Sequence, residues 1–193
     1  MSLEAIPNLE LSAPLAPETI PGLHAGQRVI LSGVVYTARD AAHRRLAEAL
    51  QAGQELPIPL AGQVIYYVGP APTRPGDIIG PAGPTTAGRV DLYTPALLEQ
   101  GLKGMIGKGK RSAAVRQAII TYAAVYFVMV GGAAALIAQC IKRASLVAYQ
   151  DLGPEAIYRL EVEALPMVVA NDVYGADLFE IGQAKYRREA KSS

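Results

Sequence analysis

The chain has 193 residues, of which 51% are hydrophobic and 18% charged, and its formal net charge is +1 at pH 7. This hydrophobic content excludes a disordered chain, and the small net charge predicts no strong attraction to nucleic acid or to an anionic membrane. A typical soluble domain has about 25% charged residues, so the deficit indicates that a partner covers part of the surface. The length predicts a single domain over 1–193, with loosely attached ends at about 1–10 and 183–193.

One cysteine, Cys140, and two histidines, His24 and His43, limit the metal chemistry of this chain. They exclude an internal disulfide, and they exclude an iron–sulfur cluster or a cysteine-rich zinc site built by this chain alone. We therefore expect no cofactor-binding or metal-binding residues here. Residues 1–21 have no basic region and no long apolar core, so no signal peptide is expected and a cytoplasmic location is predicted.

The first half of the sequence alternates expected strands with loops rich in Pro and Gly. Strands are indicated by short apolar runs such as VIYYV, and helices by a capping residue followed by helix-forming residues. The expected elements, in chain order, are an edge strand at 9–15, a buried strand at 28–35, a helix over 38–51 capped by Thr37, a loop at 53–62, a buried strand at 64–68, a loop at 69–83 and a helical region over 86–100 that restarts at Thr94-Pro95.

The second half alternates strand and helix more regularly. Residues 102–150 follow a strand-helix-strand-helix-strand pattern, which predicts a parallel α/β layer with right-handed crossovers. The uncharged run 117–141 has the length of a membrane span, but its β-branched segment, Gly pair and small residues favour a buried strand, a tight turn and a packed helix. The expected elements are strands at 104–106, 125–130, 145–149 and 158–170, and helices over 112–122 (capped by Ser112), 133–141 and 177–190.

The segment GPAGPTTAGR at 80–89 has the strongest indications of chemistry. It combines glycines, which permit close backbone approach, with two hydroxyls and then Arg89 in the first turn of an expected helix. A cation is unfavourable at a helix N-terminus, so a bound carboxylate or phosphate would explain Arg89. The alternative is a solvated arginine on an ordinary capped helix.

Two other loops place cations where an expected strand ends. Arg39 stands beside Asp40 in the segment TARDAAH, whose His43 is more typical of an exposed or hydrogen-bonded helix residue than of a ligand. Lys108 and Lys110 lie in the run GKGKRS, which lacks the spacing of a phosphate loop. An ion pair on a wet surface and a basic solvated turn are the respective alternatives. Three cationic loops at one edge of an α/β layer would suit a small dicarboxylate.

Four segments together resemble the β subunit of two-subunit class I fumarate hydratases: GPTTAGRVDLYTP, GLKGMIGKGKRS, VYFVMVGGAAALIA and EVEALPMVVANDVYGADLF. They are equally similar to the C-terminal domain of the single-chain enzymes, and the resemblance covers about residues 10–182. The same family includes the L(+)-tartrate dehydratase β subunit, whose pattern differs between Thr86 and Arg89 and at the VANDVYG turn. Tartrate dehydration and a non-catalytic anion-binding domain therefore remain the alternative functions.

The resemblance implies a swivelling β/β/α fold with a mixed sheet. It implies reversible hydration of fumarate to (S)-malate, a reaction of the tricarboxylic acid cycle. It also implies an α subunit, on another chain, that holds a four-iron four-sulfur cluster through three cysteines, together with a small dicarboxylate substrate. Neither nucleic acid nor a membrane is expected as a partner, and an isolated β chain could self-associate through the surface meant for the α subunit.

The resemblance also implies roles for individual residues. The base toward the C3 proton falls on Thr85, and such a base requires nearby cations because a threonine hydroxyl has a high intrinsic pKa. Lys110 receives no role. The substrate-binding residues fall on Arg39, Arg89 and Lys108, and residues that support them from behind fall on Asp40 and His43.

Overall fold

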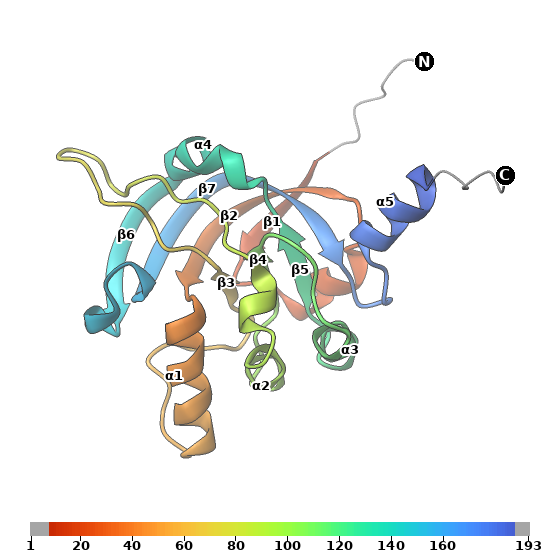
Figure 1. Ribbon diagram of the computed structural model, residues 1–193, viewed down its shortest axis with the longest axis horizontal. Coiled ribbons are helices and arrows are strands. Elements are labelled where there is room, and N and C mark those ends of the chain that lie inside the picture. The colour runs from red at the N-terminus through yellow and green to blue at the C-terminus, as the bar shows by residue number, and fades with distance from the viewer. Residues whose placement is uncertain (1–7, 188–193) are drawn as a thin grey trace, which may run out of the picture.

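The computed structural model describes residues 8–187. Seven strands form one mixed sheet in the order β1-β2-β3-β4-β5-β7-β6 (Figure 1). Neighbours from β1 to β5 are parallel, whereas β7 runs antiparallel to β2, β5 and β6. The strands are β1 (Leu9–Ala13), β2 (Arg28–Thr37), β3 (Val64–Tyr66), β4 (Gly104–Gly107), β5 (Val125–Val128), β6 (Ile141–Ala148) and β7 (Ile157–Asn171).

The pairing between β2 and β7 closes the sheet into a ring of five strands, because β7 also pairs with β5. Side chains alternate between the two faces along each strand, so each face of the ring packs against its own apolar core. Val64 and Tyr66 belong to the core cluster that also contains Phe127, whereas Ile65 and Tyr67 pack in a second cluster with residues of the helices.

Helices lie on both faces of this sheet. In Figure 1, α1, α2 and α3 lie on one side of the sheet and α4 on the other. The helices are α1 (Asp40–Gln51), α2 (Thr94–Glu99), α3 (Ala113–Thr121), α4 (Ala134–Gln139) and α5 (Leu178–Tyr186), and the short 3-10 helices are η1 (Pro17–Gly22), η2 (Ala87–Val90), η3 (Gly131–Ala133) and η4 (Gln150–Glu155).

The predicted elements are largely confirmed in the described residues. The uncharged run is divided between β5, η3 and α4, and no helix within 8–187 is long and apolar enough to cross a bilayer. Ser112 caps α3 by accepting the Val115 N–H at 3.3 Å. The predicted end segments lie largely outside the described residues, at 1–7 and 188–193, so the expectation of loosely attached ends stays a prediction.

Two predictions are wrong. The third strand of the expected parallel layer, β6, lies at the far edge and runs antiparallel to β7, because β7 already occupies the free edge of β5. Thr37 does not cap α1. It ends β2, and its buried Oγ1 donates to Ala156 O at 3.1 Å and accepts the Tyr158 N–H at 2.9 Å. Arg39 takes the N-cap position of α1 instead.

Candidate active site

The carboxyl ends of the parallel strands β2, β3, β4 and β5 lie along one edge of the sheet, each about 4.8 Å from its neighbour. Arg39 stands two residues beyond the end of β2, and Lys108 follows β4 directly. Thr85 lies 19 residues after the end of β3, yet the intervening loop folds back and places it beside that end. Ligands of α/β proteins collect at such an edge, so the sheet topology alone brings three of the predicted site residues together.

Thr85 is held against the residue that follows β3. Its N–H and its Oγ1 both donate to Tyr67 O, at 2.7 and 2.8 Å. Lys108 N donates to Thr85 O at 3.0 Å, and Ala87 N donates to Lys108 O at 2.9 Å. The two loops therefore run side by side as a short parallel bridge, which fixes the Thr85 hydroxyl next to the backbone of Lys108.

The side chain of Lys108 crosses toward the segment after β5. A Cβ built on Gly131 would lie 3.3 Å from Lys108 Nζ, so the absence of a side chain at Gly131 gives the ammonium its place. Gly131 opens η3 and is not among the glycines with a positive φ, so its backbone conformation alone does not require glycine. Gly131 therefore permits close packing of the Lys108 side chain.

Arg39 packs over Gly69, in the loop that follows β3. A Cβ on Gly69 would lie 2.7 Å from Arg39 Nη1, so any larger residue would displace the guanidinium. Arg39 Nη2 also lies 3.4 Å from Glu155 Oε1, and Glu155 Oε2 accepts the Ala41 N–H at 3.1 Å. The ion-pair partner of Arg39 is thus Glu155 and not the adjacent Asp40. Sequence analysis missed Glu155 because nothing near it in sequence relates it to a residue more than a hundred positions earlier.

Arg39 keeps unused hydrogen-bonding capacity. Its side chain is 21% exposed, and its buried Nε has no hydrogen-bond partner. A buried N–H without a partner is costly, so an anion bound here would find a donor already freed of water.

His43 supports Arg39 from within α1. The imidazole is fully buried, its Nδ1 lies 3.0 Å from Arg39 O, and its edge meets the Tyr67 ring with centroids 5.2 Å apart. A carbonyl only accepts, so Nδ1 carries the proton. Burial lowers the pKa of His43 to about 4; the Arg111 charge also lowers it, whereas the Arg39 carbonyl and Asp40 raise it. His43 is therefore neutral near pH 7.

The two remaining cations make no hydrogen bond or ion pair to Thr85, Lys108 or Arg39 within the described residues. Arg89 lies in η2 with an exposed side chain, and its N–H donates to Thr86 O at 3.4 Å. Lys110 Nζ donates to Gln183 Oε1 in α5 at 3.2 Å. The structure thus joins Thr85 and Lys108 through backbone hydrogen bonds and places Arg39 after the neighbouring strand β2. Arg89 is linked to Thr85 only through the backbone of its own segment.

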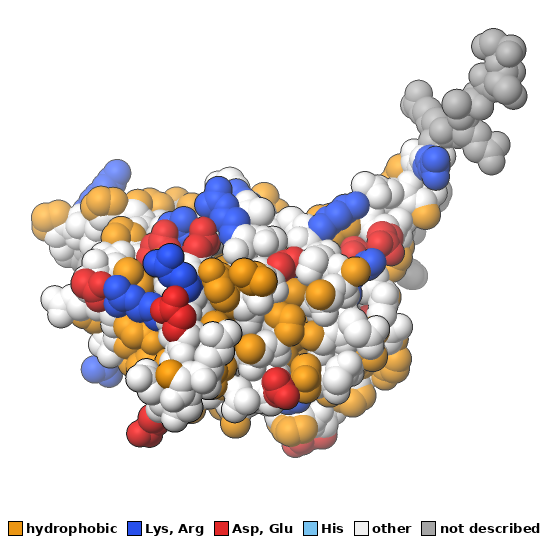
Figure 2. All heavy atoms as spheres, turned by 60° about the horizontal axis from the view of Figure 1, so that its bottom comes forward, with side chains coloured by type: hydrophobic (Ala, Val, Ile, Leu, Met, Phe, Trp, Pro, Cys, Tyr) orange, Lys and Arg blue, Asp and Glu red, His pale blue; other side chains and the backbone are white. Residues whose placement is uncertain are grey.

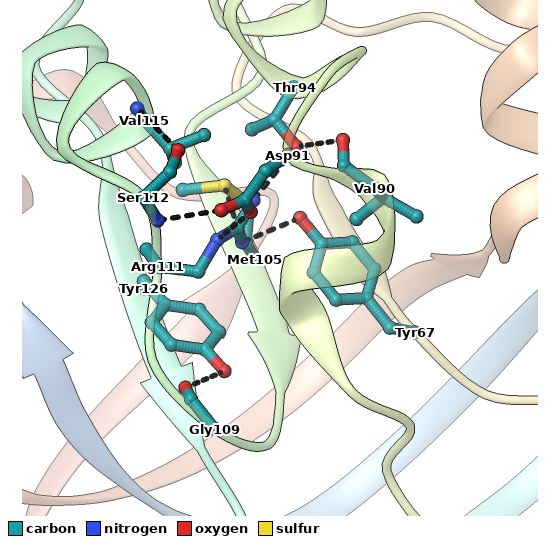
Figure 3. Close-up of polar contacts among 10 residues, drawn as sticks. All are labelled: Tyr67, Val90, Asp91, Thr94, Met105, Gly109, Arg111, Ser112, Val115 and Tyr126. Carbon is teal, nitrogen blue, oxygen red and sulfur yellow. Dashed lines mark hydrogen bonds and ion pairs between the residues drawn. The ribbon is translucent and has the colours of Figure 1, made fainter.

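Beneath these loops lies a buried polar cluster that sequence analysis missed (Figure 3). Arg111 belongs to the run expected to form a basic solvated turn, and that alternative is wrong for this residue, whose side chain is 0% exposed. Its Nε donates to Asp91 Oδ1 at 2.7 Å, and Asp91 Oδ2 accepts the Ser112 N–H at 2.6 Å. An arginine between a basic run and a helix cap gives no sequence signal for burial, because its partners come from other segments.

The surface around the helices has mixed charge. Figure 2 shows Lys and Arg side chains among Asp and Glu side chains on the face it draws, with hydrophobic side chains between them. Within residues 8–187 no group of three or more His, Cys, Asp and Glu side chains is arranged to hold a metal ion. Any anion recognition by this domain is therefore local, through the strand-end residues, and does not depend on a large positive field.

Comparison with known proteins identifies relatives over most of the chain. Residues 2–182 match the family model described as "Fumarase C-terminus". The chain is 43% identical over 155 residues to "Fumarate hydratase class I, anaerobic" of Escherichia coli (strain K12), which covers 79% of this chain and 28% of that enzyme. It is 34% identical over 172 residues to "Putative L(+)-tartrate dehydratase subunit beta" of Methanocaldococcus jannaschii, covering 86% of this chain and 88% of that protein. The chain therefore spans about a quarter of the class I fumarate hydratases it matches.

Proposed function

Because this chain belongs to the fumarase C-terminus family, we propose that it is the β subunit of an iron–sulfur-dependent hydro-lyase that interconverts fumarate and (S)-malate. A relative of which the match covers 88% is named a "subunit beta", which supports a second, α chain carrying the rest of the enzyme. The proposal includes the swivelling β/β/α arrangement for this domain and a cytoplasmic location for the complex.

The observation that carries the proposal is the position of Thr85 between two cationic loops at the carboxyl edge of the sheet. Lys108 follows one neighbouring strand and Arg39 the other. Fumarate and malate each carry two carboxylates, and guanidinium groups bind carboxylates through paired hydrogen bonds. Arg39 would bind one carboxylate. Arg89, whose long side chain is exposed, would bind the other.

Thr85 is the proposed base. In the dehydration direction its oxygen takes the proton from C3 of malate as the C2 hydroxyl leaves, and in the hydration direction it returns that proton. The Thr85 hydroxyl donates to Tyr67 O, which holds its oxygen next to the residue that follows β3. A threonine alkoxide is accessible only beside positive charge, and Lys108, whose backbone N–H binds Thr85 O, would supply that charge in the assembled site.

This chain does not fit the family's four-iron four-sulfur cluster. Such a cluster needs several cysteine thiolates, and the sequence contains only Cys140, at the C-cap of α4. The proposal therefore assigns the cluster to the α chain, where it would act as a Lewis acid toward substrate oxygen. The residues of this chain bind and orient the acid and move the C3 proton.

Tartrate dehydration is the second candidate. The match to the Methanocaldococcus jannaschii protein covers 88% of its length, so this chain has the size of a separate tartrate dehydratase β subunit. Tartrate differs from malate by one hydroxyl, and the same two carboxylate-binding arginines would accept both acids.

Co-expression with its candidate α chain under anoxic conditions tests the proposal. The purified complex, with its iron and sulfide content measured, is assayed with (S)-malate and with L(+)-tartrate, and kcat/KM is compared for the two acids. A higher value for malate supports the fumarate hydratase assignment, and a higher value for tartrate replaces it by the sister activity. Absence of turnover of both acids by a cluster-loaded complex would refute a hydro-lyase function, and failure of any cluster-bearing chain to co-purify would favour a non-catalytic anion-binding domain.

A further inference from the structure

We propose that Arg111 is a positioning residue for the strand-end site: its buried guanidinium fixes the loop that carries Thr85 and Arg89 relative to the loop that carries Lys108. This inference rests on the proposed function for its kinetic consequence, but the geometry it invokes is independent of any activity. Arg111 touches no reacting group itself and acts through the residues it binds.

The guanidinium donates in three directions, each to a different segment of the chain (Figure 3). Nε binds Asp91 Oδ1 at 2.7 Å, Nη2 binds Thr94 Oγ1 at 2.8 Å, and Nη1 binds Tyr67 OH at 3.0 Å. Asp91 follows η2, Thr94 begins α2, and Tyr67 follows β3. One rigid, planar group thus joins the segments that surround the site, which a point charge such as lysine cannot reproduce.

Two of these bonds lead to proposed site residues. Tyr67 binds Arg111 through its hydroxyl and binds Thr85 through its carbonyl oxygen, so a displacement of the Tyr67 backbone moves the proposed base. Asp91 stands two residues after Arg89, and its second carboxylate oxygen accepts the Ser112 N–H at 2.6 Å. Lys108 lies three residues before Arg111 in the same loop.

The location argues for positioning rather than for stability alone. The side chain of Arg111 is 0% exposed and that of Asp91 13% exposed, so both charges have lost most of their hydration. A buried ion pair contributes little net stability compared with apolar residues of similar size, because desolvation cancels much of the attraction. The guanidinium carbon Cζ of Arg111 also lies over the rings of Tyr67 and Tyr126, 5.3 and 4.9 Å from their centroids. These contacts fix the plane of the guanidinium group.

The test uses the assembled, cluster-loaded complex with two graded variants. Arg111→Lys keeps the positive charge but loses the planar set of N–H donors. Tyr67→Phe removes only the hydroxyl that accepts from Arg111 Nη1. Arg116→Met is the control, because the Arg116 side chain pairs with Asp177 and Glu180 at 3.3 and 2.6 Å and, within the described residues, makes no hydrogen bond or ion pair to 85–91 or 107–112. Turnover is expressed per cluster-loaded complex, and hydrogen exchange is measured by peptide on each variant.

We expect kcat to fall about 100-fold in Arg111→Lys and about tenfold in Tyr67→Phe, with KM changed less than kcat, since misplacement of a reacting group by about 1 Å costs up to about 100-fold. Exchange should accelerate in peptides covering 85–94 and 107–112 and not at the far edges of the sheet, in β1 and β6, and Arg116→Met should leave kcat and the accelerated peptides unchanged. Unchanged kcat in both variants, or exchange accelerated evenly along the chain, would overturn the inference. If the wild-type complex turns over neither acid, the proposed function fails, and the exchange pattern alone decides whether Arg111 holds the two loops.

Discussion

Replacement of His43 by Asn should remove a pH-dependent part of the stability of this protein. The His43 imidazole is fully buried, and burial lowers its pKa from the ordinary 6.5 to about 4. Asn keeps an amide donor near the position of Nδ1, so the bond to Arg39 O can persist while the titrating group is lost.

The sign follows from proton uptake by the two states. As pH falls through 6.5 the unfolded chain binds a proton on His43, whereas the folded protein binds it only near pH 4. The stabilisation is therefore complete above pH 6.5 and is lost as pH falls from 6.5 to about 4. With these two pKa values, the loss between pH 7.5 and pH 5 amounts to about 2 kcal/mol of unfolding free energy.

Urea unfolding of the full chain, followed by circular dichroism at several pH values from 5 to 7.5, measures this effect. The difference in unfolding free energy between wild type and His43→Asn should shrink by about 2 kcal/mol over that range as pH falls. His24→Gln, at the other histidine, whose side chain is exposed, serves as the control and should not alter the wild-type slope. A difference between wild type and His43→Asn that stays constant with pH would refute a buried neutral His43.

The remaining predictions concern the site and one strained glycine. Thr85→Ala should lower kcat by about 10²–10⁴ without loss of assembly, with partial recovery in Thr85→Ser; an undiminished rate would remove Thr85 from the mechanism. Gly69→Ala should push the Arg39 guanidinium from its place and raise the KM for malate about tenfold, as measured in steady-state assays; an unchanged KM would show that Arg39 does not bind substrate. Gly33→Ala should destabilise the chain by about 3 kcal/mol or more in urea unfolding, because Gly33 has φ +114° and an added Cβ would lie 2.2 Å from Ala13 O; near-wild-type stability would contradict this backbone.

Local sequence signals predicted most elements because their causes are local. The Ser112 cap, the Thr94-Pro95 helix start and the division of the uncharged run into β5, η3 and α4 each depend on residues within a few positions of one another. Pairing between strands is not local. Nothing in the segment that became β6 indicates that β7, and not β6, would take the free edge of β5.

The candidate site likewise has features set by local sequence and features set by contacts between distant segments. The sequence determined which loops carry hydroxyl and cationic side chains after strands, and its family resemblance assigned Thr85, Arg39, Arg89 and Lys108, assignments that stay predictions until tested. Only the tertiary structure decided what those side chains face. Glu155 reaches Arg39 from η4, and Arg111, expected in a solvated turn, is buried against partners from three other segments. Burial and ion pairing depend on which segments the closed sheet brings into contact, and a spacing along the chain cannot report that.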